Sequence, residues 1–485
     1  MKRIPAAAFL FFALVSLQGL LCAEEAPITW QGTIREASEQ HRAVLQMTKT
    51  GAGAWRAMGF YIEFVPDWML QIDQFTAYGA KLRFTAYGGK GVFEGRMTPD
   101  GQEIDGTWSY KKQVSQVQLK RAGNESAWHV PFLYQYHYRD TTYLRPSADE
   151  PRIPFSPQLA MTYLEQGAIA WTVEQHCVAC HTNGSYMVVR PMLTAQFGVP
   201  QKELRDYFVT ALREQLTPDP DDPRWQPEPT QVVYIAAGLA IWDANVTHRL
   251  SPETAEALNL MFKLQRDTGD WYIDDDNNPP LESKTYQLAT VAARAVANAP
   301  GWRLQQRGTP TEARIRRLEE FLRAERDVQG DYDRTDLLWT ASEYPGLLDA
   351  KRMRELSAMV LSHQQPDGGW SIRTFARPEE WGKGNRAQKL REEPEFGNPP
   401  SDGHMTGLAI IALRKAGTPA TDPRIQRGVE WLKANQRASG RWYTRSLNRD
   451  AWQFITYSGT AYPLLALSLC DALGPQSMSG TISGR

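Results

Sequence analysis

The chain has 485 residues, of which 42% are hydrophobic and 22% are charged, and its 54 basic side chains are balanced by 55 acidic ones. This length is too great for one compact core, and the near-neutral charge excludes a chain built to bind nucleic acid. The composition is that of a globular protein and excludes a mainly disordered one.

Residues 1–23 have the layout of a secretory signal peptide, because Lys2 and Arg3 precede an apolar run that ends at Ala23. We therefore predict an exported, periplasmic protein whose mature chain begins near Glu24. The apolar run approaches the ~20 residues that cross a bilayer, so an uncleaved membrane anchor is the alternative, and contact with a membrane stays open.

Residues 27–121 alternate between apolar and polar side chains in short runs bounded by turn signals, a pattern typical of half-buried antiparallel strands. The turn "TPDG" at residues 98–101 predicts a hairpin, because proline fixes one φ and glycine supplies a positive one. We expect a small antiparallel β barrel or meander of about eight strands. The frame "WQGTI … GVFEGRMTPDGQEIDGTWSYKKQVSQVQLKR" resembles the lipocalin-like domains of exported hydrolases, and this resemblance implies an accessory or docking role. Residues 122–156 are interpreted as an ordered linker.

A helix–turn–helix unit recurs six times between residues 157 and 475. Three of the turns, "QRDTGDW", "QQPDGGW" and "QRASGRW", share the spacing Q-x-x-x-G-x-W, and each is followed by a helix rich in small residues. The six turns are anchored at residues 175, 215, 265, 326, 364 and 436. A closed ring leaves no hydrophobic end uncovered, so six hairpins predict two concentric rings of helices, an all-α (α/α)6 toroid. The glutamine and tryptophan side chains of the turns are expected to tie neighbouring repeats together.

The first turn has a different sequence, "EQHCVACHTNGSYMVVRP". Cys177, Cys180 and His181 form C-x-x-C-H, the attachment pattern of a c-type haem. In this pattern the two thiols bind the haem covalently and the histidine binds the iron. We therefore predict one covalent haem c per chain in the first repeat of the toroid. The remaining cysteines, Cys22 in the signal segment and Cys470, do not make a disulfide framework.

The second axial ligand of this haem decides its chemistry, since Met or His favours electron transfer and an open position favours ligand chemistry. All loops from a first to a second helix lie at one end of a ring. His404 and Met405 open a second helix, and His363 closes a first one, so these side chains are candidates. Met187 is also a candidate, although a segment of six residues must pass round the haem edge to reach the opposite face.

"QQPDGGW" and "QRASGRW" resemble the QW repeats of squalene–hopene cyclases, and the helical region resembles the toroid of terpenoid cyclases and of protein prenyltransferase β subunits. "CVACHTNGSYMVVRP" resembles a segment of exported bacterial toroid proteins that combine such repeats with a haem motif. Cyclases of this class protonate an alkene with an acid in D-x-D-D. "DPDD" has this spelling, so Asp219, Asp221 and Asp222 are the acid candidates, but the prolines around them favour a solvated loop.

The leading interpretation is an exported mono-haem c-type protein that acts in electron transfer or in haem-based redox chemistry. Its partner would be a redox protein or a small hydrophobic molecule. The first alternative is a terpenoid-cyclase-like enzyme that acts on a hydrophobic isoprenoid. The second is a module that binds a hydrophobic ligand without turnover. Whether the chain is an enzyme stays open.

Overall fold

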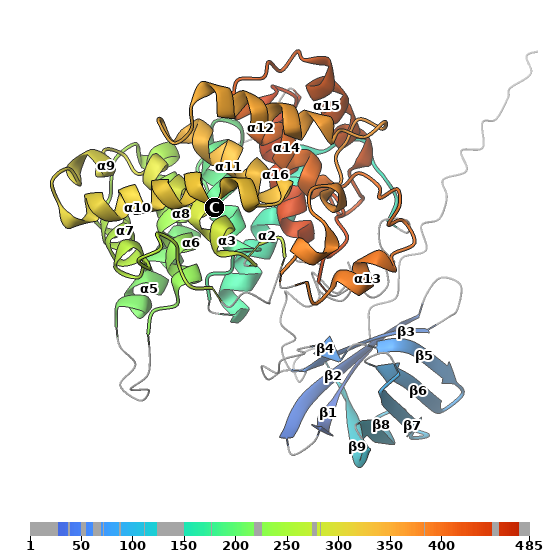
Figure 1. The fold of residues 1–485 in the computed structure, drawn as a ribbon. Helices are drawn as coiled ribbons and strands as arrows, with labels where there is room; N and C mark the ends of the chain where they lie inside the picture. Colours follow the sequence, from blue (N-terminus) through green and yellow to red (C-terminus); the bar gives the residue numbers. More distant parts are fainter. Residues whose placement is uncertain are drawn as a thin grey trace, which may run out of the picture. The chain divides into compact units, whose positions relative to one another are not determined.

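The computed structural model describes residues 28–36, 39–49, 55–61, 69–70, 72–86, 89–110, 112–123, 150–175, 177–217, 226–273, 279–281, 283–382, 384–448 and 455–474. The chain forms two compact units, Met1–Val130 and Pro131–Arg485 (Figure 1). The predicted signal peptide and most of the predicted linker lie outside the described residues.

The first unit is an antiparallel meander of nine strands within the described ranges. The strands are β1 (Ile28–Glu36), β2 (Glu39–Lys49), β3 (Trp55–Tyr61), β4 (Met69–Leu70), β5 (Ile72–Tyr78), β6 (Lys81–Ala86), β7 (Gly91–Met97), β8 (Glu103–Tyr110) and β9 (Gln113–Ala122). Their order in the sheet is β4-β3-β2-β1-β9-β8-β7-β6-β5. Because β1 pairs with both β2 and β9, the first and last strands lie side by side, and the predicted barrel-like meander is confirmed.

Large side chains fill the concave face of this sheet. Along β6 the buried residues alternate with exposed ones, as a strand with one covered face requires. Phe84 of β6 stacks on Phe93 of β7 with ring centroids 4.8 Å apart, and Trp108 of β8 packs beside them. The predicted hairpin turn joins β7 to β8, where the Gly101 amide donates to the Thr98 carbonyl (2.9 Å).

The second unit consists of six helical hairpins within the described ranges. The first helices are α2 (Pro157–Gln175), α5 (Lys202–Leu216), α7 (Pro252–Lys263), α10 (Pro310–Ala324), α12 (Ala350–Ser362) and α15 (Pro423–Asn435). The second helices are α3 (Asn183–Val189), α6 (Pro229–Trp242), α8 (Thr285–Asn298), α11 (Asp331–Glu343), α14 (Gly403–Lys415) and α16 (Ile455–Leu469). Short helical segments lie between them: η2 (Arg190–Leu193), α4 (Thr194–Phe197), η3 (Asp243–Thr247), α9 (Trp302–Gln305), η4 (Arg326–Val328), η5 (Ile372–Thr374), η6 (Pro378–Glu380) and α13 (Ala387–Arg391). No helix in the part of the chain that the structure describes is long and apolar enough to cross a membrane.

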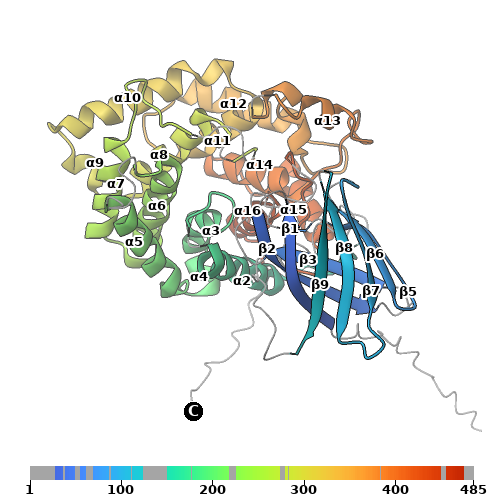
Figure 2. The same cartoon turned by 90° about the horizontal axis from the view of Figure 1, so that it is seen from below.

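The second helices form a closed inner ring, because each contacts the next and α16 contacts α3. Figure 2 shows this ring with α5, α7, α10 and α12 on its outside. Small residues let the inner helices approach closely. A Cβ on Gly238 would lie 2.8 Å from the Met187 side chain, and one on Gly407 would lie 2.6 Å from the Pro463 backbone. The predicted (α/α)6 toroid is confirmed.

The three Q-x-x-x-G-x-W turns are built in the same way. Each glutamine amide donates both to the carbonyl of its own turn glycine and to a carbonyl at the start of the next first helix. The second acceptors are Arg314 (3.2 Å), Arg424 (2.7 Å) and Ser156 (2.8 Å) for Gln265, Gln364 and Gln436 respectively. Each tryptophan indole donates to the first helix of its own hairpin, at Met261 (2.6 Å), Val360 (2.8 Å) and Leu432 (2.7 Å). Since Ser156 precedes α2, the last turn closes the ring onto the first repeat.

The turn near residue 326 differs from the other three. Arg326 opens a short 3-10 turn, and Gly330 is the N-cap of α11 with φ −65°, so it does not take the positive φ of the other turn glycines. Tyr332, which replaces the tryptophan in sequence, lies in α11 and bonds to His404 of α14 (3.0 Å). The resemblance of this copy to the other turns is therefore one of sequence only.

Candidate functional site at the mouth of the ring

The C-x-x-C-H segment forms the loop between α2 and α3, at the end of the ring where the inner helices begin. Its backbone is held by side chains. The backbone carbonyl of Cys177 accepts from the Trp171 indole (3.1 Å) and from the side-chain Nδ2 of Asn183 (3.0 Å). The side-chain Oδ1 of Asn183 also accepts from the backbone amide of Ala179 (2.8 Å). The loop thus has a fixed conformation that positions its two thiols and its imidazole.

His181 is 5% exposed, and its Nδ1 lies 2.7 Å from the hydroxyl of Thr182. The imidazole also packs against the Trp171 ring in an edge-on contact, with centroids 4.6 Å apart. Because Thr182 holds the ring through Nδ1, Nε2 is the nitrogen that an iron would take. Burial lowers the pKa of His181 to about 3, so the imidazole is neutral, as a metal ligand must be.

The two thiols of the loop have different neighbours. Burial raises the pKa of Tyr207 in α5, and the nearby charge of Cys177 adds to this shift. Burial likewise raises the pKa of Tyr234 in α6 and Tyr462 in α16, and Cys180 adds to both shifts. Cys180 is buried, whereas Cys177 is half-buried.

These donors fit a c-type haem in kind: two cysteines separated by two residues precede a neutral histidine that is anchored through Nδ1. Among the described residues, no group of three or more His, Cys, Asp or Glu side chains could hold a metal ion.

Two of the predicted distal ligands have hydrogen-bond partners on their ring nitrogens. His404, fully buried in α14, has Nε2 3.0 Å from the Tyr332 hydroxyl and Nδ1 2.9 Å from the Ser458 hydroxyl. His363 has Nε2 2.9 Å from a carboxylate oxygen of Asp331. An iron bond to His404, or to His363 through Nε2, would require one of these hydrogen bonds to break.

The other predicted site residues are placed as follows. Met187 is fully buried in α3 against Gly238 of α6, and Met405 is fully buried in α14. The acid candidates Asp219, Asp221 and Asp222 lie outside the described residues.

Sequence reasoning missed a buried charged network in the inner ring. Arg294 of α8 donates to the Asp336 carboxylate of α11 (2.6 Å) and lies over the Trp339 ring, 4.5 Å from its centroid. The Thr290 hydroxyl bonds to the same carboxylate (2.7 Å). Arg294 and Asp336 are 2% and 3% exposed, so this ion pair is a fixed part of the interior.

A second buried acid, Asp333, lies one turn earlier in α11. Lys284 donates to it (2.7 Å), yet burial outweighs this cation and raises the pKa of the carboxyl. The sequence "DYDRTD" at the start of α11 could have indicated these buried acids, since its second and third aspartates are three residues apart and share a helix face. A buried acid of this kind can deliver a proton.

Comparisons with known proteins found only remote likenesses. No protein-family model and no curated protein matches the chain. Among solved structures, an ent-copalyl diphosphate synthase from Streptomyces platensis has 15% identity and a TM-score of 0.39, and 60% of this chain and 50% of that chain are covered. The chain thus spans about half the length of that synthase.

Two further structures show similar levels of likeness. A protein from Actinoplanes has 11% identity and a TM-score of 0.36, with 65% of this chain and 100% of that chain covered. A glycosidase has 13% identity and a TM-score of 0.34, with 71% and 97% covered. The (α/α)6 toroid of the helical unit is defined by its own closed ring of inner helices rather than by these neighbours.

Proposed function

We propose that the helical unit is a c-type haem protein, in which Cys177 and Cys180 bind the haem covalently and His181 binds the iron. The observation that carries this proposal is the loop itself. Its backbone is fixed by Trp171 and Asn183, and its buried imidazole is anchored through Nδ1. A chance occurrence of C-x-x-C-H in the sequence would not require these supporting contacts.

In this proposal the residues around the loop have defined tasks. Thr182 sets the orientation of the His181 ring, and the edge-on contact with Trp171 helps to keep this ring buried. When bound, the haem supplies one-electron transfer or the binding of a small ligand, with a redox protein or a small hydrophobic molecule as partner. Attachment of c-type haem takes place outside the cytoplasm, so the proposal includes export to the periplasm.

Covalent haem can be measured directly. The full chain is expressed with the cytochrome c maturation machinery, and haem is measured by in-gel haem staining and by the pyridine haemochrome spectrum. We expect one haem per chain in the wild type and loss of covalent haem in Cys177→Ser/Cys180→Ser. The matched control Cys470→Ser, which removes a buried thiol far from the loop in sequence, keeps the haem. A wild-type chain that matures without covalent haem contradicts the proposal.

A terpenoid-cyclase-like enzyme is the second candidate, and the buried aromatic side chains of the inner ring favour it. Aromatic rings from three inner helices, Tyr234, Trp339 and Tyr462, are buried there, and aromatic faces stabilise cations. The acid Asp333 lies on α11 with a raised pKa.

The Cys177→Ser/Cys180→Ser protein separates the two candidates. Cyclisation of an isoprenoid hydrocarbon by this variant at the wild-type rate supports the cyclase, because that chemistry does not use the haem.

A further inference from the structure

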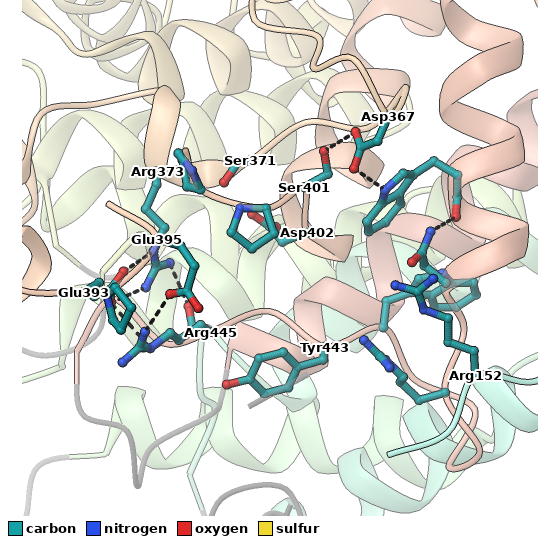
Figure 3. A pocket seen from close by; sticks show the side chains of 17 residues that line it. Arg152, Asp367, Ser371, Arg373, Glu393, Glu395, Ser401, Asp402, Tyr443 and Arg445 are labelled. Atoms are coloured by element: carbon teal, nitrogen blue, oxygen red, sulfur yellow. Dashed lines mark hydrogen bonds and ion pairs between the residues drawn. The ribbon is translucent and has the colours of Figure 1, made fainter. Parts of the chain in front are cut away.

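A second site lies in the same unit, between the turns of the fifth and sixth repeats. A cavity of about 670 Å³ opens there (Figure 3). Its size is within the ~300–1,000 Å³ of small-molecule sites. The residues that line it come from α15, from the segments after α12 and α15 and from the stretch before α2, and none belongs to the C-x-x-C-H loop.

The charges on one side of the cavity neutralise one another. Arg373 makes a two-pronged ion pair with Glu393, with nitrogen–oxygen distances of 2.9 and 2.8 Å. Arg445 lies 3.5 Å from Glu393 and 3.6 Å from Glu395. Figure 3 shows these four side chains together at one end of the cavity. This side is therefore a preformed wall with little net charge.

The opposite side has two arginines, Arg152 and Arg437, and one carboxylate, Asp367, which accepts from the Ser401 hydroxyl (2.7 Å) and the Trp431 indole (2.9 Å). Arg152 and Arg437 face each other across an isolated antiparallel bridge, and both line the cavity. The nearby acid, Glu150, already forms a buried ion pair with Arg441. Burial lowers the pKa of Arg437, and the charge of Arg152 lowers it further. The Nε of Arg437 is buried and has no hydrogen-bond partner within the described residues. Two neighbouring guanidinium groups of this kind favour a carboxylate or another anion.

Polar and aromatic groups lie between the two sides. Ser371 is fully buried, and its hydroxyl has no hydrogen-bond partner within the ranges that the structure describes. Such a hydroxyl is costly unless a ligand satisfies it. Trp431 and Tyr443 line the same cavity and offer flat apolar surfaces with polar ends. The cavity thus combines a place for an anion, a place for a hydroxyl and flat faces for a ring.

We propose that this cavity binds an acidic saccharide, with its carboxylate against Arg152 and Arg437, its ring against Trp431 and Tyr443, and a hydroxyl on Ser371. This site is separate from the proposed haem site. A neutral sugar would leave the two guanidinium groups without a counter-charge. A simple inorganic anion would leave the Ser371 hydroxyl and most of the volume unused.

Calorimetric titration of the full chain tests the ligand class with three probes: digalacturonate, the neutral disaccharide cellobiose, and inorganic phosphate. We expect digalacturonate to bind at least tenfold more tightly than either of the others. Equal affinity for cellobiose overturns the anionic requirement. Equal affinity for phosphate shows a simple anion site and overturns the saccharide. Absence of binding by digalacturonate overturns the proposal as a whole.

Three variants locate the binding. Arg437→Gln and the exposed Arg152→Gln should each weaken digalacturonate binding at least tenfold, whereas Arg316→Gln on α10, a partly exposed arginine outside the cavity, should leave it unchanged. Ser371→Ala should weaken binding at least threefold without lowering the melting temperature of the ligand-free chain, because it removes a hydroxyl that the empty protein leaves unpaired. Unchanged binding in Arg152→Gln and Arg437→Gln, or in Ser371→Ala, contradicts the proposed placement. None of these readouts depends on haem.

Discussion

At the scale of single residues, Asp402 is a buried carboxyl with an unusual pKa. It is the N-cap of α14, accepting from the amide of Met405 (2.9 Å), and its other oxygen accepts from the amide of Ile372 (2.7 Å). Burial outweighs these bonds and raises its pKa to about 6. Between pH 4 and 6 the unfolded chain loses this proton while the native chain keeps it. Stability contributed by the protonated form is therefore lost as pH rises through this window.

Asp402→Asn should remove this pH dependence, because asparagine also caps helices and does not titrate. We expect the unfolding free energy of the wild type, relative to the variant, to fall by about 2 kcal/mol between pH 4 and pH 7. Urea denaturation at several pH values measures the difference. Asp422→Asn is the matched control at the N-cap of α15. The bond from Arg424 lowers the pKa of Asp422, so its stabilisation is lost as pH falls. If the stability difference between wild type and variant changes with pH in the same direction for Asp402→Asn and for Asp422→Asn, the raised pKa of Asp402 is contradicted.

At the scale of elements, the repeat pattern located the turns well. The first helices end within two residues of the predicted anchors, from Gln175 at the end of α2 to Asn435 at the end of α15. Near residue 326 the hairpin is present but its turn is built differently, because this copy keeps only the glycine of Q-x-x-x-G-x-W and Gly330 does not take a positive φ. The Arg294–Asp336 pair was also missed. It joins two helices more than forty residues apart, and periodicity within one helix does not say which helix lies opposite.

The glycine of each Q-x-x-x-G-x-W turn is where two repeats meet. Gly440 has φ +90°, and a Cβ there would lie 2.4 Å from the backbone of Leu159 in α2. Gly417 has φ +96° with no atom within 4 Å of such a Cβ. Both alanine substitutions should cost about 1–3 kcal/mol for the strained backbone. Gly440→Ala should cost roughly 2 kcal/mol more, because α2 must also move. Chemical denaturation measures the unfolding free energy of both variants. Equal losses for Gly440→Ala and Gly417→Ala would show that the contact between repeats at Gly440 is not tight.

At the scale of the whole helical unit, ring closure depends on a stretch of chain before the first helix. The amide of Ile153 donates to the carbonyl of Gln436 (3.0 Å), and the amide of Ala438 donates to the carbonyl of Pro151 (3.0 Å). The Gln436 side chain adds bonds to both the amide and the carbonyl of Ser156. The last turn is thus bound to the first repeat by backbone and side chain alike, across nearly the full length of the unit.

Glu150 contributes a charged interaction to this ring closure, since it forms a buried ion pair with Arg441, whose side chain is 1% exposed. Removing one partner of such a pair leaves a buried charge without a counter-ion, so Glu150→Ala should destabilise the unit by about 3–5 kcal/mol. Glu355→Ala is the matched control, because its pair with Arg352 on α12 is exposed and should be worth less than about 1 kcal/mol. Chemical denaturation of both variants gives the two losses. A loss for Glu150→Ala as small as that of the control would mean that the ring holds together without this ion pair, and that the hydrogen bonds of Gln436 carry the closure.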